Sequence, residues 1–183
     1  MARIGLDNFL YAVLDESDST PSYGTAKKTG KAINCNVNIT NYNAKLYADN
    51  GIAESDSGFQ GGTVSIGLDH EDINMFAELL GHTVTSGEVV KNVNDVAPYV
   101  GFGRIVTLVK GGVKSYKVEF LHKVQFGEPN VEETTKGESL EFGTYTLEGT
   151  IMSMANGDWC KAKTFTGDNA RASAETYLEG LFA

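Results

Sequence analysis

The chain has 183 residues, of which 41% are hydrophobic and 21% are charged, and its formal net charge at neutral pH is −9. This composition supports one well-packed core and argues against an intrinsically disordered chain. An acidic protein is also a poor candidate for binding nucleic acid, because a nucleic-acid-binding surface needs Lys and Arg side chains to contact the phosphates. No run approaches the roughly 18 apolar residues of a membrane span, and the first apolar run is too short for a signal peptide. We therefore expect a protein that has no membrane anchor and is made and kept in a cytoplasm until it assembles.

Alternating apolar residues predict strands in the first third of the chain. Residues 9–14 form a short apolar run and predict a first strand, followed by an exposed loop rich in Ser and Asp over residues 15–24. In residues 32–40, apolar side chains alternate with asparagines, which predicts a strand with one solvent-exposed, polar face. Residues 63–68 alternate in the same way and predict its neighbour.

The segment between these strands, residues 41–62, is long and rich in turn-forming residues. A structureless stretch of this length inside a compact domain is usually functional or disordered. It carries too many apolar side chains for simple disorder, namely Leu46, Tyr47, Ile52 and Phe59. We predict a loop that becomes ordered against another subunit, with these four residues as the candidate subunit interface.

One central helix is predicted over residues 69–81. Asp69 is a suitable N-cap, an apolar stripe includes Ile73 and Phe76, and Gly81 stands where a helix commonly ends. Residues 84–90 after it read as strand around a Ser86-Gly87 turn.

The longest predicted elements are two strands, residues 99–110 and 113–126, joined by Gly111-Gly112. Two glycines between strands are typical of a tight hairpin turn with positive φ. The second strand alternates with period 2 except at Leu121 and His122. In the first strand both alternations are partly apolar, so we expect one face to use the chain's own core and the other to meet a neighbouring molecule.

The last third predicts an acidic loop at residues 127–137, strands at 139–154 and 159–165, and a terminal helix capped by Asp168. Nothing divides the chain, so we predict a single domain over residues 1–183. Its class is mainly β (α+β), an antiparallel β-sandwich or barrel with one central and one C-terminal helix. The predicted core consists of Val37, Ile39, Val64, Ile66, Phe76, Leu79, Leu80, Val118 and Phe120.

No motif indicates catalysis, a cofactor or a metal. His70, Glu71, Asp72 and His82 do not have the spacing of a helical zinc motif, and the two cysteines show no CxxC or Cys/His spacing. Gly101-Phe102-Gly103 is an isolated GxG inside a predicted strand, where a bulge or close packing explains the glycines better than phosphate binding. We therefore predict no catalytic residue, no metal ligand and no cofactor.

Six segments, in order along almost the whole chain, resemble the major tail protein, or tail tube protein, of siphophages that infect Gram-positive bacteria. They are ARIGLDNFLYAVL (residues 2–14), AKLYADNGIAESD (44–56), MFAELLGHTV (75–84), APYVGFGRIV (97–106), KGESLEFGTYTLEG (136–149) and NGDWCKAKTF (156–165). None of them is a chemical motif, and the specificity of the resemblance lies in their joint order.

The resemblance implies a structural virion protein. In that family, antiparallel sheets with a flanking helix form a subunit, six subunits close into a ring with a continuous inner β-barrel, and stacked rings form the tail tube through which the genome passes. It implies as partners further copies of the chain, the tape measure, the tail terminator and baseplate components. The location implied is the virion tail, after assembly in the host cytoplasm. Some relatives carry a C-terminal immunoglobulin-like domain, for which we expect no room here.

A passing genome must not be held by the wall of such a tube. We therefore expect Asp and Glu to outnumber Lys and Arg on the lumen face, with Glu138, Glu141 and Glu148 as candidates. Lys117 and Lys123 are expected to face outward or to pair with a carboxylate.

Two other functions remain open from the sequence. The first is a small-ligand binding barrel in which the apolar face of residues 113–126 lines a pocket. The second is an acid/base enzyme that uses His70 or His82.

Overall fold

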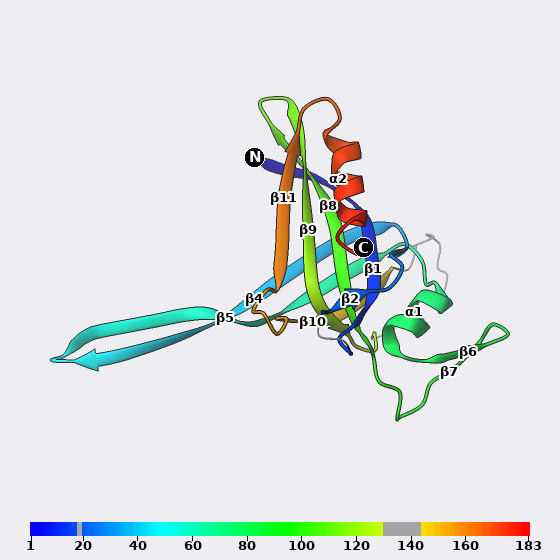
Figure 1. Cartoon of the computed structure of the whole chain (residues 1–183), viewed down its shortest axis with the longest axis horizontal. Helices are drawn as coiled ribbons and strands as arrows, with labels where there is room; N and C mark the ends of the chain where they lie inside the picture. Colours follow the sequence, from blue (N-terminus) through cyan, green and yellow to red (C-terminus); the bar gives the residue numbers. More distant parts are fainter. Residues whose placement is uncertain (18–19, 130–143) are drawn as a thin grey trace, which may run out of the picture.

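The protein is described by a computed structural model, which covers residues 1–17, 20–129 and 144–183 (Figure 1). Strands dominate, and the two helices of the described residues are short. The elements are β1 (Ala2–Asp15), β2 (Ser22–Tyr23), β3 (Lys27–Lys28), β4 (Ala32–Ala48), β5 (Gly51–Leu68), α1 (Ile73–Leu80), β6 (Thr83–Thr85), β7 (Glu88–Val90), β8 (Tyr99–Lys110), β9 (Val113–Phe126), β10 (Tyr145–Met152), β11 (Cys160–Thr166) and α2 (Ala170–Glu179).

Nine of the strands form one antiparallel sheet. Its order is β2-β1-β8-β9-β10-β5-β4, with β11 paired to β9 and β3 paired to β1, while β6 and β7 form a separate hairpin. The predicted mainly β, antiparallel class is therefore confirmed, but β1 and β4 are not hydrogen-bonded to each other and no barrel is closed within the described residues.

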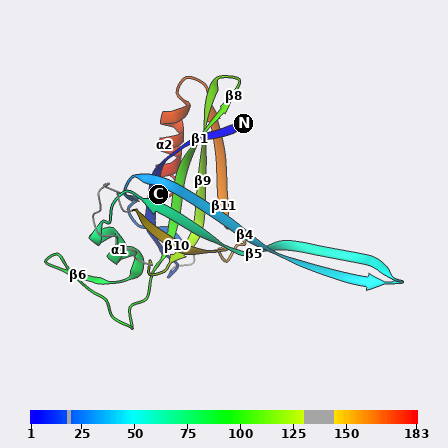
Figure 2. The same ribbon diagram turned by 180° about the vertical axis from the view of Figure 1, so that it is seen from behind.

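The sheet divides into two layers at β9. Residues 115–121 of β9 pair with β11, whereas residues 123–126 pair with β10. The register against β8 shifts between Val100 and Phe102, which is the mark of a β-bulge. Figures 1 and 2 show the result: β1, β8, β9 and β11 form an upright layer, and β10, β5 and β4 run across it as a crossing layer.

The bulge explains why the alternation of β9 fails at Leu121 and His122. Before it, Phe120 packs on the side of the upright layer that α2 covers. After it, Val124 packs on the opposite side, against the crossing layer. One extra residue moves every following side chain to the other face of a strand. Both residues are fully buried, so the upright layer has a core on each of its two faces.

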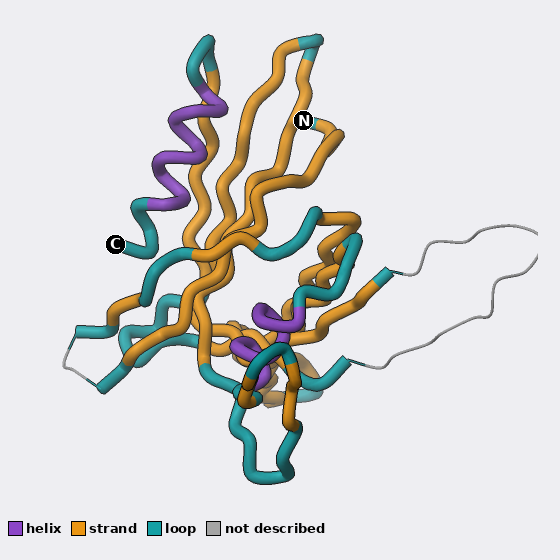
Figure 3. The backbone as a smooth tube through the Cα atoms, turned by 90° about the vertical axis from the view of Figure 1, so that its right-hand side faces the viewer, coloured by secondary structure: helices purple, strands orange, loops and turns teal. Residues whose placement is uncertain are grey.

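The first core lies between the two layers and is closed at one end by α1. Phe9, Tyr11, Ile66 and Phe102 belong to it, together with Met75, Phe76, Leu79 and Leu80 of α1. The second core lies between the upright layer and α2, which runs alongside these strands in Figure 3. It contains Leu10, Ala12, Ile105, Val118, Phe120, Ala174, Leu178 and Phe182.

The predicted close packing at Gly101 and Gly103 is confirmed. A Cβ atom on Gly101 would lie 2.6 Å from the Tyr23 ring, and one on Gly103 would collide with Leu178 of α2. The two glycines therefore let the Tyr23 ring and α2 approach the upright layer closely. The hairpin turn at Gly111-Gly112 is also confirmed, since φ is 57° and 80° there.

The central helix is shorter than predicted. It begins after Asp72, whose side chain accepts hydrogen bonds from the backbone N–H groups of Asn74 and Met75, so the predicted N-cap at Asp69 is wrong. Asp69 instead accepts a hydrogen bond from the Lys31 backbone N–H at 2.8 Å. The helix ends at Gly81 with φ of 77°, as expected.

Three further predictions need correction. The N-cap of the terminal helix is Asn169 rather than the predicted Asp168. Ile39, predicted in the core, is 37% exposed, because it lies where β4 leaves the body of the protein. Val37 is only half-buried, and the other seven predicted core residues are buried.

Candidate assembly surface

The segment predicted as a loop is a β-hairpin arm, residues 41–59, which continues β4 and β5 beyond the body of the protein (Figures 1 and 2). Its two strands pair antiparallel from Asn41 opposite Phe59 to Ala48 opposite Gly51. Eight extended residues at about 3.3 Å each give the arm a reach of roughly 26 Å. The prediction of a loop is therefore wrong. The strands are hard to predict from the sequence because register shifts between Thr40 and Asn41 and between Leu46 and Tyr47 interrupt the alternation of side chains.

Turn chemistry fixes the tip of the arm. Asp49 and Asn50 have φ of 48° and 64°, in the left-handed region. This pair of conformations suits a two-residue hairpin turn, and Asp and Asn tolerate it better than other non-glycine residues. The tip is therefore built to reverse the chain tightly.

Three of the four predicted interface residues are exposed on the arm. Leu46, Tyr47 and Ile52 are 59%, 65% and 55% exposed, and Tyr47 lies directly opposite Ile52 across the two strands. A two-stranded hairpin alone in water is marginally stable. Exposed apolar side chains on such an element make it a candidate interaction surface.

The fourth residue, Phe59, anchors the arm to the body. Its ring is half-buried and stacks on Trp159, with centroids 4.6 Å apart and planes 3° from parallel. Farther out, the Tyr42 ring lies across Gly58, where a Cβ atom would come within 2.7 Å of it. The base of the arm is therefore packed, whereas its outer part is not.

Two of the longer strands in the described residues, β4 and β11, have a backbone edge that is not paired in the sheet. Within residues 1–17, 20–129 and 144–183, β4 pairs only with β5, and β11 only with β9. Such edges carry backbone N–H and C=O groups ready to pair with another chain.

The outer face of the crossing layer is polar and carries little charge. Register places Glu148, Ser65 and Asn36 in one row and Thr150, Thr63 and Asn38 in the next. Glu148, a predicted lumen candidate, is exposed here. The other two candidates, Glu138 and Glu141, lie outside the described residues. Lys117 and Lys123 each pair with a carboxylate, Glu119 at 2.6 Å and Glu16 at 2.5 Å.

His70 and His82, the two histidines of the proposed acid/base enzyme, each contact a carboxylate. His82 has a 6% exposed side chain, with Nδ1 2.7 Å from Asp95 Oδ2 and Nε2 against Glu128. Hydrogen bonds from the Asn92 backbone and from His82 hold the pKa of Asp95 below its usual value. His82 thereby ties the end of α1 to the loop after β7 and to the segment after β9. Among the residues that the structure describes, no group of three or more His, Cys, Asp or Glu is placed to hold a metal ion.

The ligand-barrel alternative required the apolar face of β9 to line a pocket. Val118 and Phe120 are instead fully buried against α2, and Val124 and Phe126 against the crossing layer. These four side chains are therefore part of the chain's own cores. None of the described helices is long and apolar enough to cross a membrane.

Sequence reasoning missed two features. The first is the pairing of Trp159 with Phe59, which joins segments a hundred residues apart and has no local signal. The second is the ion pair between Arg104 and Glu119, which became visible only with the register of β8 against β9.

Comparison with models of known protein families and with curated proteins gives no match for this chain. A function for it therefore rests on its own residues, on the geometry above and on the ordered resemblance of its segments.

Proposed function

We propose that this chain is a structural virion protein, the major tail protein of a long-tailed phage. It forms hexameric rings that stack into the tail tube, the conduit for genome ejection. The arm is the observation that carries this proposal, because it is an ordered element with exposed apolar side chains and little surface of its own to cover them.

The unpaired edges of the long strands β4 and β11 support the same function. An exposed edge is a pairing hazard for a monomer, and closing a ring removes it. Copies of the chain that meet through β4 and β11 satisfy these backbone groups, while the arms reach a neighbouring copy. The long strands and the polar outer face of the crossing layer suit a wall that faces solvent or a passing polymer.

Further partners follow from the resemblance. A tube must begin at a baseplate, be measured by a tape-measure protein and be closed by a terminator, so we propose these proteins as neighbours at its ends and inside it. DNA passes through without specific binding, and the protein resides in the virion tail. No catalytic residue, cofactor or metal enters this proposal.

Sedimentation velocity over a concentration series tests the role of the arm. We expect the intact chain to form hexamers and larger species as its concentration rises. A variant with residues 42–58 replaced by a short Gly/Ser turn should remain folded and fail to form stacked species. The matched control replaces Val93, which is 97% exposed, with Ser. Normal stacking by the shortened variant would show that the arm is not an assembly element.

A further inference from the structure

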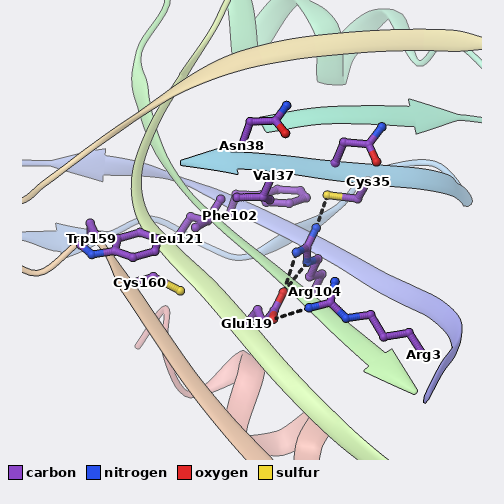
Figure 4. A pocket seen from close by; sticks show the side chains of 11 residues that line it. Arg3, Cys35, Val37, Asn38, Phe102, Arg104, Glu119, Leu121, Trp159 and Cys160 are labelled. Carbon is purple, nitrogen blue, oxygen red and sulfur yellow. Dashed lines mark hydrogen bonds and ion pairs between the residues drawn. The ribbon is translucent and has the colours of Figure 1, made fainter. Parts of the chain in front are cut away.

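A cavity of about 550 Å³ opens between β4 and the β8, β9 and β11 strands (Figure 4). Cys35 of β4 lies on one side, Arg104 and Glu119 lie across from it, and Trp159 and Cys160 lie at one end. Arg3, at the start of β1, reaches its rim with a side chain that is 67% exposed.

The charges at this cavity do not balance. Arg104, whose side chain is only 9% exposed, donates from Nε and Nη2 to Glu119 Oε2 at 2.9 Å and 2.5 Å. Lys117 donates to the other oxygen of Glu119 at 2.6 Å, and Arg3 lies 3.9 Å from it. Arg3, Arg104 and Glu119 line the cavity, so its lining carries one positive charge in excess, and Lys117 next to it adds a second, in a chain whose net charge is −9.

The third nitrogen of the Arg104 guanidinium has no anionic partner. Nη1 contacts the Cys35 sulfur, and thiols are weak acceptors. Burial raises the pKa of the Cys35 thiol above its ordinary value of 9.0, so this thiol is neutral at neutral pH. For Glu119, burial acts to raise the pKa, but the hydrogen bonds from Lys117 and Arg104 outweigh it and lower the pKa, so its single negative charge is already fully present. Arg104 is paired with Glu119 through two of its nitrogens, but among the described residues its buried Nη1 has only the weak acceptor Cys35, and an anion entering the cavity supplies a strong one.

We propose that this cavity is an oxyanion-binding site, and that in the assembly the oxyanion is a carboxylate on the arm of a second copy. The proposal rests on the proposed function, because it names the surface that receives the arm. The shared chemistry is a carboxylate or phosphate group placed between Arg3 and Arg104.

The arm carries the complementary charge. Between residues 41 and 59 it has one cation, Lys45, and three exposed carboxylates, Asp49, Glu54 and Asp56, a net charge of −2. A subunit's own arm starts beside its own cavity, at the Phe59–Trp159 stack, but runs away from the body (Figures 1 and 2). The cavity is therefore left to the arm of another copy.

The chain contains a built-in reporter for this site. Its only two cysteines, Cys35 and Cys160, both line the cavity, so their rate of alkylation by iodoacetamide measures whether the cavity is filled. We expect alkylation of the intact chain to slow by about tenfold between dilute and assembling concentrations, as about 90% occupancy of the site requires.

Charge variants identify the two sides of the contact. Arg3→Glu on the rim, or Glu54→Lys with Asp56→Lys on the arm, should abolish this protection. The chain that combines all three changes should regain it. Lys114→Glu, at an exposed position at the start of β9, is the matched control and should show the same protection as the intact chain.

Adding free oxyanions to the protein distinguishes the two possible ligands, a carboxylate on the arm of a second copy and a small anion from solution. Protection of dilute protein by millimolar phosphate or acetate, with no further change as the protein concentration rises, would overturn the arm as the source. If the cysteines react equally fast in tubes and in monomers, the proposed oxyanion site is wrong. The formation of tubes would still support the proposed function. A chain that neither associates nor gains protection would contradict both.

Discussion

Replacing Phe120 with Ala tests the core beneath α2. Its side chain is fully buried and meets three aromatic rings edge to face, with centroid distances of 5.4 Å to Tyr23, 4.9 Å to Phe182 and 5.1 Å to His122. Burying a Phe removes roughly 150–250 Å² from water, which corresponds to about 4–6 kcal/mol at about 25 cal/mol per Å². Substitutions of buried Phe by Ala cost about 3–5 kcal/mol, so we expect a loss of about 4 kcal/mol in the free energy of unfolding.

The assay is urea unfolding of dilute, unassembled protein, followed by the fluorescence of Trp159, the only tryptophan. Tyr47→Ala is the matched control, because its ring is 65% exposed on the arm, and its free energy of unfolding should change by less than about 0.5 kcal/mol. A loss below about 1 kcal/mol for Phe120→Ala would refute the packing of α2 on β9 described above.

Three further predictions concern packing, pH and DNA. Gly103→Ala should cost about 1–3 kcal/mol, because the added methyl group collides with Leu178, and Leu178→Ala in the same chain should lessen that cost in a double-mutant cycle. Because hydrogen bonds hold the pKa of Glu119 below its ordinary 4.5, the stability that this residue contributes is present above pH 4.5 and is lost as the pH falls through its folded pKa. Glu119→Gln should therefore be less stable than the intact chain at pH 7, and the difference should shrink steadily as the pH is lowered below 4.5, whereas a difference that does not change with pH in the acid range would contradict the linkage. Six copies at −9 give a ring a formal charge of −54, so duplex DNA should not bind assembled tubes at about 0.15 M salt in a filter-binding assay, and micromolar binding would show a basic inner wall.

Local chemistry explains which parts of the fold could be predicted. The hairpin of β8 and β9 follows from alternation and from two glycines, and the C-terminal end of α1 follows from Gly81, because each signal lies within a few residues. The start of α1 was misplaced because several acidic residues precede it and only the backbone decides which of them caps the helix.

Long-range features escaped prediction because they depend on register. Both faces of β8 carry apolar residues, and from the sequence alone this predicts that one face meets a neighbouring molecule. In the structure, α2 of the same chain covers one of these faces. The arm reads as a loop because its asparagines, glycines and serines are common in turns, and its register shifts interrupt the alternation. The convergence of Arg3, Arg104 and Lys117 on Glu119 requires β1, β8 and β9 to lie side by side, which no local pattern reveals.

Negative-stain electron microscopy of the purified chain at rising concentration tests the central claim most directly. We expect end-on views to average into six-fold rings with a central hole, and side views to show stacks of such rings. Monodisperse single subunits at every concentration, or closed particles without a hole, would contradict the assignment of this chain as a tail tube subunit.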